Sequence, residues 1–365
     1  MAEKKKILVV DDSAFMRRVV SDIINSDNRC EVIGTANNGK EGLELAEKLK
    51  PDVITLDVQM PIMSGLEMLR ILNKTNPIPV VMLSTLMKEG GKETMEALEL
   101  GAYDFIKKPD NIFRVSSDDI KGELIEKVLE AAASGKRSFR QYRPLIRPTY
   151  EPKTREDTAT GIKPLISKPS KVNNLVALGT STGGPKALQY VLPYLPANMN
   201  AGMVIVQHMP VGFTKSLSDR LNQLSEISIK EAEDKDIIEN GKAYIAPGDK
   251  HLEVKEDSNG SLVISLTDGP PRGGHKPAVN VMLSSIADNV TKKKLIGVIM
   301  TGMGADGMEG MLEVKNKQKM HIIAQNEETC VVYGMPKSVV EKGIADEIVP
   351  LERIADAIIK QSGVL

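Results

Sequence analysis

The feature that most constrains the fold is an alternation of short apolar runs with segments of helical periodicity, which occurs twice along the 365 residues. Between Lys6 and about Ala133, each apolar run is followed by a segment with helical spacing. These runs are Ile7–Val10, Val32–Ala36, Val53–Leu56, Val80–Leu83 and Phe105–Ile106. Because strands and helices that alternate form parallel sheets with helices on both faces, this part predicts a doubly wound α/β domain.

The same alternation returns after residue 171. The predicted strands are Leu175–Leu178, Met203–Val206, Ala243–Ala246, Leu295–Met300 and His321–Ala324. Leu252–Lys255 and Leu262–Leu266 enclose the turn sequence Asp257-Ser258-Asn259-Gly260, which predicts a β-hairpin added to a second parallel sheet. Helices are expected after Pro185, Pro210, Pro277, Asp306 and Pro336.

A proline-rich stretch separates the two alternating parts. It carries Pro144, Pro148, Pro152, Pro164 and Pro169 among scattered arginines and lysines. Its pattern is that of neither strand nor helix, and it predicts an extended connector. The connector is either a plain spacer or a basic segment that contacts acidic surfaces. We expect one domain over residues 1–133, a linker over 134–171 and a second domain over 172–365.

Composition narrows the class of protein. A net charge of -1, 3% aromatic residues and no tryptophan argue against a broad nucleic-acid surface. No apolar run approaches the ~18 residues that a membrane span needs, and the N-terminus has no signal-peptide pattern. Cys30 and Cys330 are too few for a disulfide framework. We expect a cytoplasmic protein without membrane insertion.

Polar residues stand at the ends of the predicted strands of the first domain. They are Asp11-Asp12, Asp57, Ser84-Thr85 and Lys108-Pro109. Carboxyl ends of parallel strands meet at one edge, where three carboxylates need a cation, and oxygen ligands favour Mg²⁺. Asp57 is then a candidate phosphoryl acceptor. Taken singly, the acidic pair could be a solvated turn and Lys108-Pro109 a plain loop.

The first domain resembles the receiver domain of two-component response regulators. The resemblance rests on VVDDS at Val9–Ser13, DVQMPIMSGLEML at Asp57–Leu69, Ser84 and the Lys108-Pro109 pair. It implies a flavodoxin-like fold, a Mg²⁺ site at Asp11, Asp12 and Asp57, and phosphorylation of Asp57 by a partner histidine kinase. It also implies switch roles for Ser84, Phe105 and Lys108.

In the second domain, Gly179-Thr180-Ser181-Thr182-Gly183-Gly184 follows a predicted strand and precedes a helix. Gly179-x-Ser181-x-Gly183 fits a nucleophile elbow, but a glycine turn before a helix can also bind an anion. Two further strand ends carry His208 and Asp306. A hydroxyl, an imidazole and a carboxylate at one edge are the set needed for acyl transfer.

Alternative roles exist for these residues. Asp306 could simply cap the following helix. His251 and His275 lie in loops and His321 opens a strand, so each is expected to be structural. Backbone N–H groups of the Gly302–Gly304 turn could hold an oxyanion.

The second domain resembles the chemotaxis protein-glutamate methylesterases, the CheB family. The matching segments are GTSTGGP at Gly179–Pro185, QHMPVGFT at Gln207–Thr214, YIAPGDKHLEV at Tyr244–Val254, GHKPAVNVM at Gly274–Met282 and MTGMGADGMEGM at Met300–Met311. The resemblance implies a Ser181-His208-Asp306 triad, an oxyanion-hole amide from Met303, and no cofactor in this domain. Thr180 stands where alanine is usual and could alter contacts at the rim.

The resemblance also implies the reactions. They are demethylation of methylated glutamates and deamidation of glutamines on chemoreceptors. We expect the unphosphorylated first domain to cover the rim of the second and phosphorylation of Asp57 to release it. The alternative is a phosphorylation-gated adaptor that holds a nucleotide or phosphate at Gly179–Gly184. A DNA-binding regulator is a weaker alternative, since nothing after Lys136 resembles a basic recognition helix.

Overall fold

The structure is a computed structural model and describes residues 3–84, 88–108, 118–134 and 171–365. It divides into two compact units, residues 1–143 and 144–365, and each unit is described here by itself. Thr85, Pro109 and residues 135–170 of the predicted linker lie outside the described residues. The domain boundaries at 133 and 171 therefore stay predictions.

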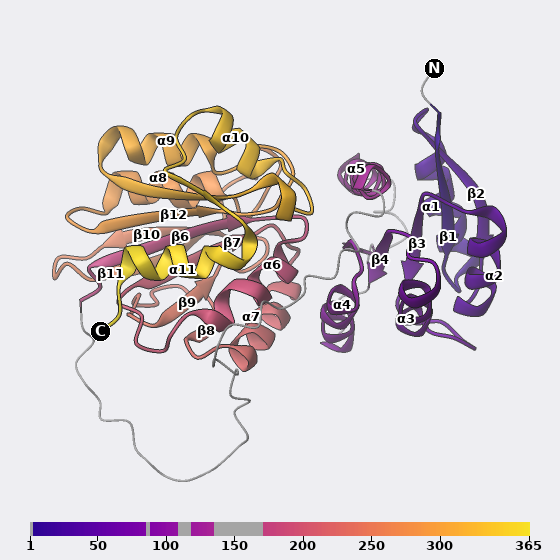
Figure 1. Cartoon of the computed structure of the whole chain (residues 1–365), viewed down its shortest axis with the longest axis horizontal. Coiled ribbons are helices and arrows are strands. Elements are labelled where there is room, and N and C mark those ends of the chain that lie inside the picture. The colour runs from indigo at the N-terminus through magenta and orange to yellow at the C-terminus, as the bar shows by residue number, and fades with distance from the viewer. Residues whose placement is uncertain (1–2, 85–87, 109–117, 135–170) are drawn as a thin grey trace, which may run out of the picture. The chain divides into compact units, whose positions relative to one another are not determined.

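The first unit is a five-stranded parallel sheet in the order β2-β1-β3-β4-β5. Its strands are β1 (Lys5–Val10), β2 (Cys30–Ala36), β3 (Val53–Asp57), β4 (Val80–Ser84) and β5 (Asp104–Lys107). Its helices are α1 (Ala14–Asn25), α2 (Gly39–Leu49), α3 (Gly65–Thr75), α4 (Lys88–Leu100) and α5 (Asp118–Ser134). α1 contacts α5, while α3 contacts α2 and α4, so the helices form two layers (Figure 1).

Helix α3 begins close against the end of β3. Ser64 and Glu67 form a capping box at its first turn. The Gly65 N–H donates to the Val58 carbonyl at 2.9 Å, and a Cβ on Gly65 would lie 2.0 Å from the carbonyl oxygen of Asp57. Glycine therefore permits the helix to start beside Asp57.

The second unit is a seven-stranded parallel sheet in the order β14-β13-β12-β6-β7-β9-β8. Its strands are β6 (Asn174–Thr180), β7 (Gly202–Gln207), β8 (Ser228–Glu231), β9 (Lys242–Ile245), β12 (Lys294–Ile299), β13 (Met320–Gln325) and β14 (Glu347–Val349). The antiparallel hairpin is β10 (His251–Glu256) and β11 (Leu262–Thr267).

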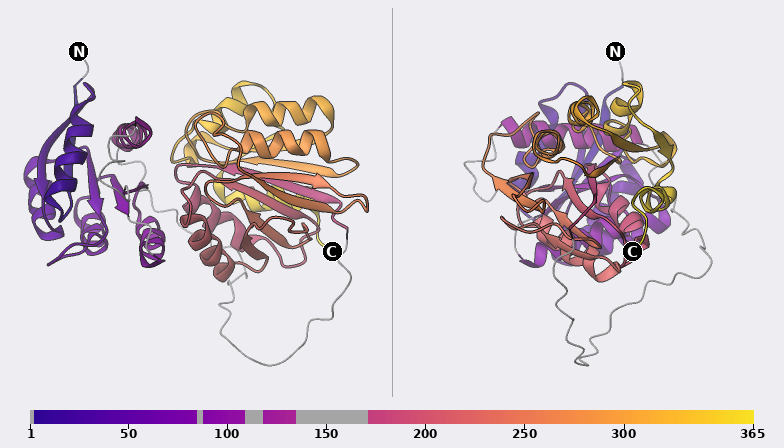
Figure 2. Two further views of the ribbon diagram at one scale, coloured as in Figure 1. Left: turned by 180° about the vertical axis from the view of Figure 1, so that it is seen from behind. Right: turned by 90° about the vertical axis from the view of Figure 1, so that its left-hand side faces the viewer.

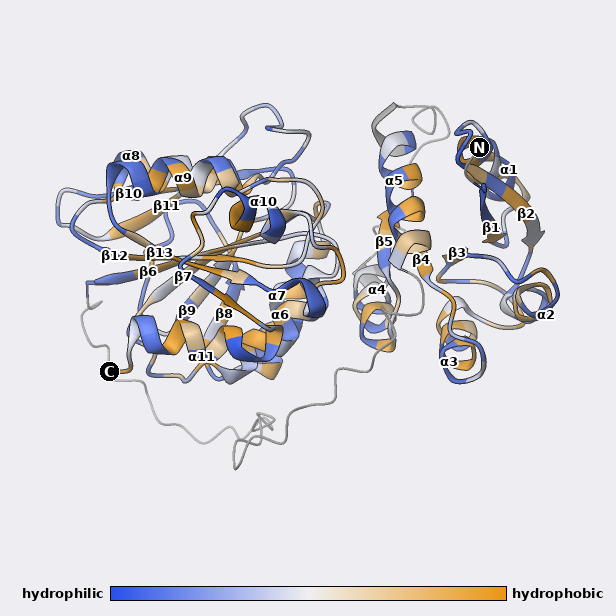
Figure 3. Cartoon of the chain, turned by 45° about the horizontal axis from the view of Figure 1, so that its top comes forward, coloured by the Kyte–Doolittle hydropathy of each residue, from blue (hydrophilic) through white to orange (hydrophobic). Residues whose placement is uncertain are grey.

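Within residues 171–365, six α-helices cover both faces of this sheet. They are α6 (Gly184–Val191), α7 (Phe213–Leu224), α8 (Val279–Asn289), α9 (Met308–Lys317), α10 (Met335–Glu341) and α11 (Leu351–Ser362). Figures 1 and 2 show α8, α9 and α10 on one face and α6, α7 and α11 on the other. Figure 3 shows hydrophobic residues along the strands, and helices on which hydrophobic and hydrophilic residues alternate. The predicted fold class, two doubly wound parallel-sheet domains with an added hairpin, is confirmed.

Among the strands and α-helices that the structure describes in the second unit, β8, β14 and α11 have no counterpart in the prediction. β8 and β14 are the edge strands, and β14 is only three residues long. An edge strand pairs on one side only and needs few apolar residues, so its sequence signal is weak. α11 does carry a signal, because its buried residues Leu351, Ile354, Ala355 and Ile358 follow helical spacing.

No helix in the described part of the chain combines the length and apolar character needed to cross a bilayer.

The close approach of α3 to β3 gives a stability test. We expect Gly65→Ala to lower the free energy of unfolding of the first domain by about 1–3 kcal/mol, because the new methyl group overlaps a backbone oxygen. Gly122→Ala in α5 is the matched control. Its Cβ would meet nothing within 4 Å, and we expect it to stabilise by about 0.4–1 kcal/mol.

The measurement is hydrogen exchange of the β1 and β3 amides in the full chain, which reports the first domain alone. Equal stability of the two alanine variants would contradict the steric argument.

Candidate functional site

Strand order brings Ser181, His208 and Asp306 to one edge of the large sheet. β6 lies between β12 and β7, and Ser181 and His208 directly follow β6 and β7. The backbone ladder continues past the strand ends, since the His208 N–H donates to Thr180 at 3.2 Å and the Ser181 N–H to Thr301 at 3.0 Å. The imidazole and the hydroxyl-bearing residue therefore share the carboxyl edge, as the sequence predicts.

Two glycines permit the close packing around Ser181. Gly183 has φ +76°, and a Cβ there would lie 2.6 Å from the side chain of Val331. A Cβ on Gly302 would lie 2.8 Å from the Ser181 Cβ. The sharp turn after β6 leaves Ser181 partly exposed at the start of α6.

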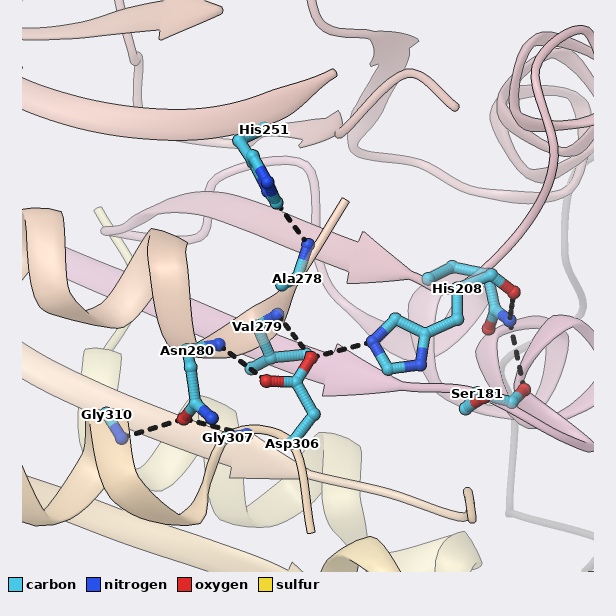
Figure 4. A network of polar contacts seen from close by, with 10 residues as sticks. Ser181, His208, His251, Ala278, Val279, Asn280, Asp306, Gly307 and Gly310 are labelled. Atoms are coloured by element: carbon cyan, nitrogen blue, oxygen red, sulfur yellow. Dashed lines mark hydrogen bonds and ion pairs between the residues drawn. The ribbon is translucent and has the colours of Figure 1, made fainter. Parts of the chain in front are cut away.

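His208 pairs with Asp306. His208 Nε2 lies 2.7 Å from Asp306 Oδ2, and the two side chains are only 8% and 7% exposed. His208 Nδ1 is buried and has no hydrogen-bond partner among the residues that the structure describes. Figure 4 shows that the Nδ1 side of the ring faces Ser181.

Asp306 is held by the first turn of α8. Its Oδ2 accepts from the Val279 N–H at 2.6 Å and its Oδ1 from the Asn280 N–H at 2.9 Å (Figure 4). Burial alone would raise the pKa of Asp306, but His208 and these N–H groups together hold it below the ordinary value. The carboxylate is therefore ionised and can only accept, so Nε2 donates the hydrogen bond of this pair and Nδ1 takes no part in it.

The alternative that Asp306 caps the helix following it is wrong. The carboxylate accepts from the N-terminus of α8, which precedes Asp306 in the chain, rather than from α9, whose N-cap is Gly307. The Asn280 side chain joins the start of α8 to the start of α9. Its Oδ1 accepts from the Gly307 and Gly310 N–H groups at 3.0 and 2.8 Å.

The turn that carries Met303 is anchored at Gly302. The Gly302 N–H donates to Val332 at 3.0 Å, and its carbonyl accepts from Gly334 and Met335. Within the described residues, no acceptor receives a hydrogen bond from the Met303 N–H. That amide can therefore donate to a ligand.

Thr180 contacts the segment beside Ser181, but it does so through a buried side chain. Its side chain is fully buried, and its hydroxyl donates to the Thr301 carbonyl at 2.8 Å. This buried hydrogen bond joins the end of β6 to the segment that follows β12.

The remaining histidines differ in role. Both nitrogens of buried His251 are bonded, to the Pro270 carbonyl and the Ala278 N–H, and His321 contacts Glu347 at 3.0 Å. His275 is different, because its ring stacks on that of His208 with centroids 3.9 Å apart. Sequence reasoning missed this contact. The one sequence feature that could have indicated the contact is that His275 shortly precedes α8, the helix whose first turn binds Asp306.

The predicted site residues of the first domain also lie close together. Ligand atoms of Asp11, Asp12 and Asp57 lie within 4.8 Å of one another. Lys108 Nζ lies 2.7 Å from Asp11 Oδ2 and 2.8 Å from Asp57 Oδ1. An all-carboxylate oxygen set fits Mg²⁺. Burial and the negative charge of Asp11 raise the pKa of Asp57 to about 6, although Lys108 opposes the rise.

Ser84 ends β4, and Phe105 lies within the neighbouring strand β5, where it pairs with Met82. The buried Ser84 hydroxyl accepts from Thr94 at 2.7 Å. Phe105 is also buried, and Lys127 of α5 lies 5.5 Å from its ring centroid.

Comparison with known proteins finds a family match for each half of the chain. The CheB methylesterase family matches residues 176–358, and the response regulator receiver domain family matches residues 7–115. A protein-glutamate methylesterase/protein-glutamine glutaminase of Pyrococcus horikoshii is 45% identical over 99% of this chain and 94% of its own length. The Bacillus subtilis protein of that name is 46% identical over 97% of each chain.

A crystal structure of the Thermotoga maritima CheB methylesterase catalytic domain is 44% identical, covering 52% of this chain and 99% of that one, with a TM-score of 0.49. The class is thus a response regulator receiver domain joined to a carboxylic ester hydrolase. The chain belongs to the CheB methylesterase family.

The raised pKa of Asp57 predicts a pH-dependent stability. The unfolded carboxyl, with an ordinary pKa of 3.8, loses its proton at lower pH than the folded one, so the free energy of unfolding falls as pH rises from about 4 to 6. In EDTA at pH 7.5 we expect Asp57→Asn to raise the free energy of unfolding of the first domain by about 1–3 kcal/mol. At pH 4 we expect no change in this free energy.

Hydrogen exchange of the first-domain core amides measures this difference. Asp22→Asn removes an exposed carboxylate of α1 and is the control. A stability gain that is the same at both pH values would contradict the burial argument.

Proposed function

We propose that this chain hydrolyses the methyl ester of methylated glutamate side chains on chemoreceptors and the amide of selected glutamines. The observation that carries the proposal is the His208–Asp306 pair at 2.7 Å, with the buried Nδ1 on the side of Ser181. The names of the relatives, protein-glutamate methylesterase/protein-glutamine glutaminase, support the substrate class. We expect the protein to act in the cytoplasm.

Ser181 is the nucleophile in this proposal. Its Oγ attacks the ester carbonyl carbon while His208 Nδ1 accepts the hydroxyl proton. Asp306 stabilises the imidazolium through Nε2, and the Met303 N–H donates to the oxyanion. His208 then protonates the departing methoxide, which leaves as methanol, and the acyl group remains on Ser181.

Water completes the cycle. His208 deprotonates a water molecule that attacks the acyl-enzyme. The second tetrahedral intermediate then collapses to free glutamate while His208 returns the proton to Ser181 Oγ. With a glutamine side chain the leaving group is ammonia, and the remaining steps are the same.

Removal of the nucleophile tests this mechanism. We expect Ser181→Ala to lower methanol release from methylated receptor at least ~1000-fold, because no acyl-enzyme can form. The exposed Ser258 in the β10–β11 turn supplies the control, and Ser258→Ala should keep full activity. A folded Ser181→Ala protein that retains most of its activity would exclude Ser181 as the nucleophile.

The first domain is the proposed regulator. Asp57 accepts a phosphoryl group from a histidine kinase, Asp11, Asp12 and Asp57 would hold Mg²⁺, and Lys108 neutralises phosphoryl oxygens. The ion, when bound, offsets negative charge on the phosphoryl group. Ser84 and Phe105 carry the change to the surface of the domain. The unphosphorylated domain blocks the hydrolase, and phosphorylation shifts the population toward an open state.

A small phosphodonor tests the regulation. We expect acetyl phosphate with Mg²⁺ to raise the rate of methanol release by the full chain and to leave the rate of Asp57→Asn unchanged. Asp22→Asn on α1 is the matched control and should respond like the unaltered chain. Normal activation of Asp57→Asn would exclude this phosphorylation site, and unaltered or lower activity after deletion of residues 1–134 would exclude autoinhibition.

A further inference from the structure

The segment from His275 to Asn280 contacts both members of the His208–Asp306 pair. Its last two residues, Val279 and Asn280, donate N–H groups to the Asp306 carboxylate. Its first residue, His275, lies against the face of the His208 ring, with centroids 3.9 Å apart and planes at 13°. One short piece of chain therefore touches the general base at its ring face and the carboxylate that orients it.

The backbone of His275 is fixed by a tight turn. Arg272 and His275 exchange two backbone hydrogen bonds, at 3.0 and 3.1 Å, across Gly273 and Gly274. Both glycines have positive φ, +60° and +82°, as the two central residues of a type I′ turn require. On the other side, the Ala278 N–H donates to buried His251. The ring of His275 is thus presented from a segment anchored at both ends.

We propose that His275 is a positioning residue for the general base His208, an inference that rests on the proposed hydrolytic function. The single hydrogen bond at Nε2 leaves the His208 ring free to tilt about that bond. A parallel ring at van der Waals distance removes this freedom and keeps Nδ1 on the side of Ser181.

The test compares His275→Ala with His275→Phe in the full chain. We expect His275→Ala to lower kcat for release of methanol from methylated receptor about 10-fold, with KM changed less than about 2-fold. His275→Phe retains a flat ring and should restore most of kcat. A rescue of kcat by the flat ring, with KM unchanged, separates positioning of the His208 ring from a general loss of structure.

His321→Ala, at a histidine that contacts Glu347 on β14, is the matched control and should leave kcat unchanged. Thermal unfolding of each variant separates loss of fold from loss of positioning, and His275→Phe remains informative if His275→Ala does not fold. Unchanged kcat in folded His275→Ala would overturn the proposal, and so would a folded His275→Phe variant that restores no activity. If Ser181→Ala is inactive while His275→Ala is fully active, this inference alone fails. If Ser181→Ala is active, the proposed function fails.

Discussion

The carboxylate of Asp306 is the point on which the arrangement of the second domain's site depends. It accepts from two N–H groups at the start of α8 and from His208, although it is almost entirely buried. A buried carboxylate is costly unless its oxygens receive hydrogen bonds, and here a helix N-terminus and an imidazole supply them. The same contacts tie together segments that are far apart in the sequence.

Two buried aspartates of this chain show how surroundings set the acidity of one side-chain type. The pKa of Asp306 lies below the ordinary value because N–H donors and His208 outweigh its burial. The pKa of Asp57 rises to about 6 because burial and the neighbouring Asp11 outweigh Lys108. A bound cation would offset the repulsion between Asp57 and Asp11, whereas the Asp306 carboxylate already receives hydrogen bonds from its neighbours.

The sites of both domains form in the same way. Parallel strands all end at one edge, so polar residues that directly follow different strands become neighbours. In the first domain this edge gathers Asp11, Asp57 and Lys108, and in the second it gathers Ser181 and His208. The glycines at positions 65, 183 and 302 allow backbone to approach backbone or side chain where the strands turn into helices.

The amino-acid sequence alone determined the two parallel α/β domains, the hairpin and the candidate residues at the strand ends, because apolar periodicity and strand-end placement are local properties. It did not indicate the edge strands β8 and β14, whose burial is partial and whose pairing is set by their neighbours. Only the tertiary structure decided which helix the Asp306 carboxylate caps, that Thr180 faces inward, and that His275 stacks on His208. These contacts join positions distant along the chain, and their geometry follows from how the elements pack in space.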